Sequence, residues 1–181
     1  ENKRIIFNGN GYDSAWVREA ERRGLSNLRT VPDCVPRLLD EQNIRLFVKH
    51  RVMSEAELRS RYEIMLENYC KVLKIEALTM VDMAMKDVLP AVSAFASALA
   101  DRAAAKKALS ENINCSYEIS IVRRLSDLVC SAFDTAERLG SAALESADGD
   151  IEKQALYFRD TVLGLMNFLR ITVDEMETMT G

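Results

Sequence analysis

The sequence predicts an all-α protein: a long antiparallel helical bundle of three long helices, the first kinked near Pro90, with an N-terminal satellite of short helices. Three observations indicate this fold class. Gly and Pro are scarce, at 7 and 3 of 181 residues, which favours long uninterrupted elements. Apolar residues recur at steps of three and four along most of the chain. Short polar links separate these stretches, so successive long helices must alternate in direction.

The composition places the chain among ordinary soluble globular proteins, with 48% hydrophobic and 29% charged residues. The net charge of −4 does not indicate the basic surface that is typical of nucleic-acid-binding proteins. No uninterrupted apolar run approaches the ~18–20 residues of a membrane span. We therefore expect neither a nucleic-acid nor a membrane partner, and a cytoplasmic location. The sequence begins at Glu1 rather than Met, so we expect it to be a piece of a longer protein.

The distribution of charged residues divides the chain into two expected parts. Residues 1–51 hold ten Lys and Arg against seven Asp and Glu, whereas residues 52–181 hold 14 against 21. We expect 1–51 to be an extended lead-in segment with short helices. We expect 52–181 to be the helical bundle.

The basic first part begins with a β-prone run at 4–7, which predicts a strand or an extended segment. Residues 8–11 (NGNG) predict a turn that requires positive φ. A phosphate loop is disfavoured there, because the third glycine of a dinucleotide fingerprint is replaced by Ser14 and the Gly-Lys-Ser/Thr of a P-loop is absent. Asp13 or Ser14 is expected to cap a helix that stops at Gly24.

A second short helix is expected to begin at Val31 or nearer Pro36, because Pro is favoured in a first turn. It carries apolar residues as far as Phe47, with a break expected near Asn43. The only histidine, His50, lies between Lys49 and Arg51 and has no metal-ligand or base partner at suitable spacing. We expect His50 to be a surface residue.

The first long helix is predicted to open with a capping box, in which Ser54 and Glu57 satisfy each other's backbone N–H groups. Pro90 is expected to kink this helix near residues 86–89, because proline removes one hydrogen bond and clashes with the preceding turn. One apolar stripe has helical spacing. Its members are Tyr62, Leu66, Tyr69, Leu73, Ala77, Met80, Ala84 and Val88.

Between Ala77 and Met85 only Thr79 and Asp82 interrupt the apolar sequence. This window is therefore expected to be enclosed on most sides, covered by two later helices. Two interpretations of Asp82 are open: a buried ligand or acid, or an ion pair with Lys86 or with a partner helix. The ion pair is favoured.

Two further long helices are expected. The first runs from about Ser116 to Ala147, after a turn marked by Asn112 and Asn114. Asp150 is expected to cap the last helix, in which apolar residues follow near-heptad steps. Those residues are Ile151, Ala155, Phe158, Val162, Leu165, Leu169, Val173 and Met176.

The sequence offers no convincing catalytic, cofactor-binding or metal-binding residue, so we expect none in this chain. No CxxC or Cys/His pattern is present, and four reduced thiols are expected at Cys34, Cys70, Cys115 and Cys130. No Glu-x-x-His pair is available for a di-iron bundle. The eight methionines are expected to serve packing. From the residues alone, the protein is interpreted as a helical interaction or assembly module.

Several long segments resemble the region after the catalytic barrel of type III glutamine synthetases. They are KRIIFNGNGY (3–12), WV (16–17), EAERRGL (19–25), ELRSRYE (57–63), ENYC (67–70), IEALTM (75–80) and YFRDTV (157–162). The resemblance covers essentially all of the chain and is weakest in residues 100–150.

The resemblance implies a non-catalytic C-terminal helical domain of an enzyme that makes glutamine from glutamate, ammonia and ATP. In this family the ATP and divalent-metal sites, for example for magnesium, belong to the catalytic domain. None of its metal-binding glutamates or phosphate-binding arginines maps onto this chain. The resemblance also implies that residues 1–51 link the bundle to an upstream catalytic barrel. The fragment alone is thus expected to be inactive, with the upstream domain and a homo-oligomer as partners. It would brace the barrel or take part in contacts between stacked hexameric rings.

Two alternatives remain open at this point. A stand-alone helical adaptor or sensor would have a start codon in place of an upstream barrel. A catalytic bundle would hold metal when purified.

Overall fold

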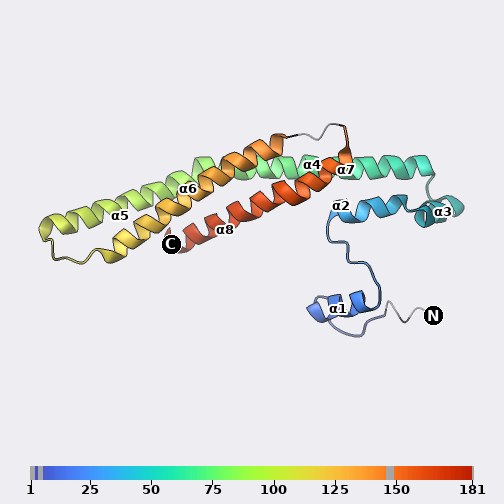
Figure 1. The fold of residues 1–181 in the computed structure, drawn as a ribbon, viewed down its shortest axis with the longest axis horizontal. Helices are drawn as coiled ribbons and strands as arrows, with labels where there is room; N and C mark the ends of the chain where they lie inside the picture. Colours follow the sequence, from blue (N-terminus) through green and yellow to red (C-terminus); the bar gives the residue numbers. More distant parts are fainter. Residues whose placement is uncertain (1–2, 4–5, 146–148, 181) are drawn as a thin grey trace. The chain divides into compact units, whose positions relative to one another are not determined.

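The computed structural model describes residue 3 and residues 6–145 and 149–180, and this part of the chain is helical with no strand (Figure 1). The all-α prediction is therefore confirmed. The chain divides into two compact units, Glu1–Met65 and Leu66–Gly181, each described by itself below. The placement of the first part as a satellite of the bundle stays a prediction.

The first unit begins with a short segment held against helix α1 (Ser14–Arg22). The rings of Phe7 and Trp16 stand 4.5 Å apart, and Arg23 lies over Trp16 while donating to the Ile6 carbonyl. Residues 6–8 form no strand, and the rest of the predicted run, residues 4 and 5, lies outside the described residues. The β-propensity was overridden by packing of the aromatic rings.

The turn at 8–11 differs from its prediction, because neither Gly9 nor Gly11 has positive φ. Gly9 has another structural reason: a Cβ there would stand 2.7 Å from the Phe7 ring. The caps of α1 follow the prediction. Asp13 accepts the Ala15 N–H, and Gly24 at φ +70° ends the helix.

Three short helical pieces follow: α2 (Val31–Cys34), the 3₁₀ turn η2 (Val35–Leu39) and α3 (Glu41–Lys49). Pro32 lies in the first turn of α2, and Pro36 in the first turn of η2, so both predicted starts are used. The break comes at Asp40 rather than at Asn43. His50 caps α3 and is exposed, as expected.

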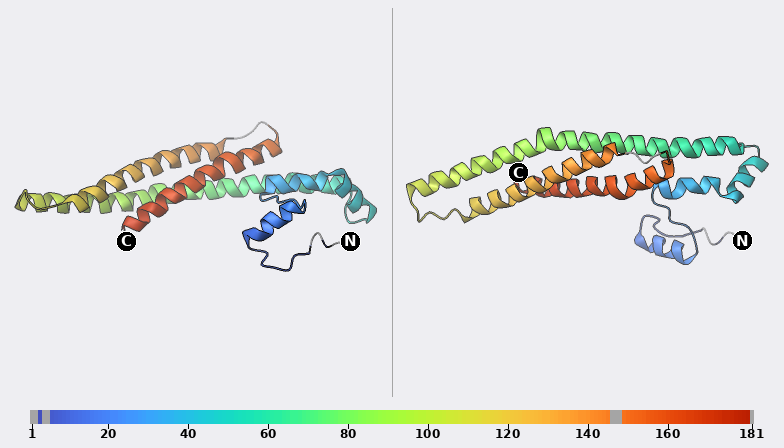
Figure 2. Two further views of the ribbon diagram at one scale, coloured as in Figure 1. Left: turned by 60° about the horizontal axis from the view of Figure 1, so that its bottom comes forward. Right: turned by 45° about the horizontal axis from the view of Figure 1, so that its top comes forward.

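A continuous helix then runs through α4 (Glu55–Met83), η3 (Ala84–Val88) and α5 (Leu89–Leu109). The capping box is confirmed: the Ser54 N–H donates to Glu57 at 2.7 Å, and the Glu57 N–H donates to the Ser54 hydroxyl at 3.3 Å. η3 is π-helical, with the Leu89 N–H bonded to the Ala84 carbonyl five residues earlier. The helix axis changes direction there (Figures 1 and 2). Pro90, which cannot donate, is the cause, and the predicted kink is confirmed.

The predicted enclosure of the Ala77–Met85 window is wrong. Ala77 and Ala84 are buried, but Thr79, Asp82 and Met83 are exposed, and Met83 is 56% accessible. The predicted stripe does hold, since each of its members is buried or half-buried. Some other apolar residues of α4 lie off the stripe and are exposed, most of all Ile75.

Helix α6 (Ser116–Leu144) is the central element of the second unit. It runs back along α5 and also packs on α8 (Leu163–Thr180) and on both π-helical segments (Figures 1 and 2). One stripe of α6 makes these contacts. Its buried apolar members are Leu125, Leu128, Ala132, Ala136, Leu139, Ala142 and Ala143. In the first turn of α6, the buried carboxylate of Glu118 forms an ion pair with the half-exposed Lys106 of α5.

The last helix comprises α7 (Ile151–Tyr157), the π-helical η4 (Phe158–Val162) and α8. Asp150 caps it as predicted, accepting the N–H groups of Glu152 and Lys153. Residues 146–147, at the end of the helix predicted for 116–147, lie outside the described residues, as does residue 148. The near-heptad residues are buried or half-buried. The three predicted long helices are therefore all present.

One helix of the described residues, the continuous Glu55–Leu109 segment, is long and apolar enough to cross a membrane by composition. Its most apolar 18-residue window has a mean hydropathy of 1.3 and is 28% buried. Helices in the cores of soluble proteins meet the same criterion, so this finding is weak evidence for a membrane span.

Replacing Glu57 with Gln is expected to lower the free energy of unfolding at neutral pH, because the capping hydrogen bonds weaken. The Ser54 N–H and hydroxyl hold the pKa of Glu57 below its usual value. The stabilisation is therefore present above the unfolded-state pKa and is lost as the pH falls through the folded-state pKa. Urea unfolding at several pH values measures this. Glu63→Gln, on an exposed face of the same helix, is the control. An equal effect of both substitutions would contradict the capping role.

Leu125→Ala is expected to destabilise the second unit by about 2–5 kcal/mol, because Leu125 is fully buried in the α6 stripe. Ile119→Ala on the exposed side of α6 is expected to cost less than about 0.5 kcal/mol. Thermal and urea unfolding of both variants measure the difference. Equal costs would show that the α6 stripe is not the main packing face.

Candidate functional site

An apolar groove lies between two helices of the second unit and is the main candidate site. Its volume is about 540 Å³, and no residue of α6 lines it. From here on, "the groove" means this site. The lining residues come from α4, η3 and α8: Ile75, Glu76, Thr79, Met80, Met83, Ala84, Val88, Met166, Leu169, Arg170, Val173, Asp174 and Glu177.

The floor of the groove is built by the inner faces of the two helices. Ala84 and Leu169 are buried, while Met80 and Val173 are half-buried. Three of the chain's eight methionines lie here, and methionine is a flexible side chain that fits irregular apolar ligands. Such a concave apolar surface is suited to binding rather than to acid–base chemistry.

The rim of the groove is acidic. Glu76, Asp174 and Glu177 face one cation, Arg170, which forms a 2.7 Å ion pair with Asp174. That pairing raises the pKa of Arg170, so the guanidinium stays charged. The rim therefore carries a net charge of −2 around an apolar floor.

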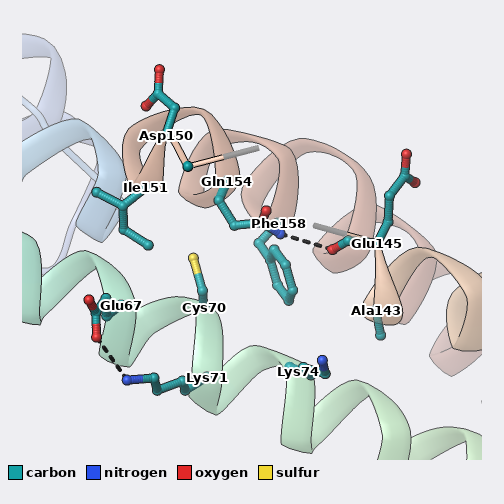
Figure 3. Close-up of a pocket in the computed structure, with 11 residues that line it drawn as sticks. Glu67, Cys70, Lys71, Lys74, Ala143, Glu145, Asp150, Ile151, Gln154 and Phe158 are labelled. Carbon is teal, nitrogen blue, oxygen red and sulfur yellow. Dashed lines mark hydrogen bonds and ion pairs between the residues drawn. The ribbon is translucent and has the colours of Figure 1, made fainter. Parts of the chain in front are cut away.

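A second, smaller pocket of about 380 Å³ surrounds Cys70. Figure 3 shows the Cys70 thiol pointing from α4 toward Ile151, Gln154 and Phe158 of the last helix. Gln154 donates to the Glu145 carbonyl at 3.1 Å, and Lys71 pairs with Glu67 on the outer side.

The Cys70 pocket lacks an activated nucleophile. Burial raises the pKa of the Cys70 thiol, which keeps it protonated at neutral pH. Three carboxylates line the pocket, and each interacts with another group: Glu67 with Lys71, Glu145 with Tyr157 and Asp150 with Lys153. Nearby, the Tyr157 hydroxyl donates to Glu145 at 2.7 Å, and its pKa is raised to about 12 by burial and by that carboxylate.

The residues singled out in the sequence are not brought together. Asp82 forms the favoured ion pair with Lys86 and is exposed, so the alternative of a buried acid is wrong. His50 belongs to the first unit, as does the turn at 8–11. Within the described ranges, no group of three or more His, Cys, Asp or Glu residues is arranged to hold a metal. The absence of functional residues stays a prediction.

The groove was missed by the sequence reasoning, although a signal was present. Ile75 and Met83 are apolar but lie off the main stripe of α4, and both are more than half exposed. The sequence reasoning expected the Ala77–Met85 window, which contains Met83, to be enclosed, and it made no prediction about Ile75. In the structure both residues line an open surface.

The fold and the site together define an all-helical protein of two units, whose second unit carries an open apolar groove. Comparison with known proteins gives the family. The family model "Glutamine synthetase C-terminal domain" matches residues 1–107, and the chain therefore belongs to this family.

Related proteins extend the match over nearly the whole chain. A glutamine synthetase of Butyrivibrio fibrisolvens is 37% identical over 98% of this chain. A type-3 glutamine synthetase of Dictyostelium discoideum is 31% identical, and a glutamine synthetase of Bacteroides fragilis is 28% identical, each over 96% of the chain. The chain spans about a quarter of the length of these relatives, 24–25%.

Cys70 is expected to react with iodoacetamide much more slowly than Cys34 and Cys130 at neutral pH, because it is buried and protonated whereas they are exposed. Peptide mass spectrometry after timed labelling measures each rate. Labelling in urea, where all thiols become accessible, is the control. Fast labelling of Cys70 in the folded protein would contradict the described packing.

Proposed function

We propose that this chain is the non-catalytic C-terminal helical domain of a type III glutamine synthetase, where it braces the catalytic domain or contributes to oligomer contacts. The assignment to type III is supported by the match to a type-3 enzyme over 96% of the chain, together with the motifs quoted above. The parent enzyme would form glutamine from glutamate, ammonia and ATP in the cytoplasm.

The single observation that carries the bracing role is the amount of apolar surface left open on the second unit. Outside the groove, large side chains of this unit that are at least half exposed include Tyr117, Leu144, Phe168 and Ile171. In a chain that spans a quarter of its relatives' length, such surface is typical of a domain that packs on other parts of an assembly.

The chemistry of the parent enzyme would take place outside these residues. ATP and a divalent metal such as magnesium would be bound by the upstream catalytic domain. A stand-alone adaptor is disfavoured by the family membership.

The test is deletion of residues 52–181 from the full-length enzyme. Sizing by light scattering and the rate of glutamine formation are then compared with those of the intact protein. Smaller assemblies would support a role in oligomer contacts, and intact assemblies with reduced activity or a lower melting temperature would support bracing.

Unchanged assembly, activity and melting temperature would overturn the proposed role. Leu125→Ala in the full-length enzyme is a milder companion variant, since it weakens the bundle without removing it. Its effect should have the same direction and be smaller.

A further inference from the structure

We propose that the groove between α4, η3 and α8 is a docking site for a basic amphipathic helix from a separate polypeptide. The inference goes beyond the proposed structural role and does not rest on it. Three properties of the groove support it: its length, its adaptable apolar floor and the charge of its rim.

The length of the groove matches a helix. Along α4 and η3 it extends from Ile75 to Val88, about 20 Å at the usual helical rise. A ligand helix of three to four turns would place residues i, i+3 or i+4, and i+7 along that distance. The two groove walls are themselves helices, so a ligand helix would pack between them as a further member of the bundle.

The floor is apolar and adaptable. Met80, Met83 and Met166 lie beside the small Ala84, which leaves room for large side chains of a partner. Methionine-lined grooves accommodate apolar anchors of differing shape, because the thioether side chain changes rotamer readily.

The rim decides the charge of the partner. Glu76 and Glu177 form no ion pair with any residue that the structure describes, whereas Asp174 is paired with Arg170. Arg170 also attracts Glu177, but three carboxylates face this one guanidinium. Lysine or arginine residues flanking the apolar face of a ligand helix would therefore be attracted to the rim. An acidic helix would be repelled. The groove is thus complementary to a basic amphipathic helix and not to amphipathic helices in general.

The experiment measures fluorescence anisotropy of labelled synthetic peptides added to the intact full-length protein. The probe is a helix of about 18 residues with leucines on one face and lysine and arginine beside them. A matched peptide carries glutamate at every basic position. The basic peptide is expected to bind more tightly, and its affinity is expected to fall as salt is raised.

Variants locate the binding site. Ile75→Glu is expected to weaken binding about tenfold or more, because a charge enters the apolar floor. Ile171→Glu is the matched control, since Ile171 is equally exposed, at 66%, and does not line the groove. Glu76→Lys combined with Glu177→Lys is expected to weaken the basic peptide and strengthen the acidic one. Circular dichroism verifies the fold of each variant.

Several results would overturn the proposal. Equal affinity for the two peptides, no binding of either, or an equal loss in the Ile75→Glu and Ile171→Glu variants would each do so. A change of oligomeric mass in Ile75→Glu without peptide binding would identify a second copy of the chain as the occupant. Nile red that binds the groove and is not displaced by the basic peptide would identify a small apolar ligand instead.

Discussion

The second unit depends on one packing face, the apolar stripe of α6. The stripe combines leucines with alanines, so that neighbouring helices approach closely and still bury large side chains. α5, η3, η4 and α8 all contact α6, whereas α5 and α8 barely touch each other. Without α6 the other helices of this unit would have little to pack on.

The π-helical segments are adjustments to this arrangement. Both η3 and η4 contact α6, and each inserts one wider turn into an otherwise α-helical partner. For η3 the cause of the wider turn is visible in the sequence, because Pro90 lies two residues after its last residue, Val88. In η4 no proline is present, and Gly164 just after it is exposed with nothing near its Cβ position. A wider turn shifts which side chains face α6 and so fits the helix to its neighbour.

Most of the fold was predictable because helix signals are local. Caps at Asp13, Ser54 and Asp150 and the apolar steps along each helix depend on residues a few positions apart. The groove was not predictable in the same way. The sequence shows that Ile75 and Met83 are apolar, but the spacing of apolar residues does not distinguish a side chain buried within the chain from one exposed on an open surface. The π-turn at Phe158 and the aromatic packing of Phe7 likewise depend on contacts that have no local pattern.

The turn between α5 and α6 has a consequence for how the protein folds. Only six residues, 110–115, join these helices. Two interactions stabilise the turn: the ion pair between Lys106 and Glu118, and the hydrogen bond that the Ser116 N–H donates to the Asn114 side chain. Closing so short a loop costs little chain entropy. The α5–α6 hairpin is therefore expected to form early, as a nucleus of low contact order to which the last helix is added.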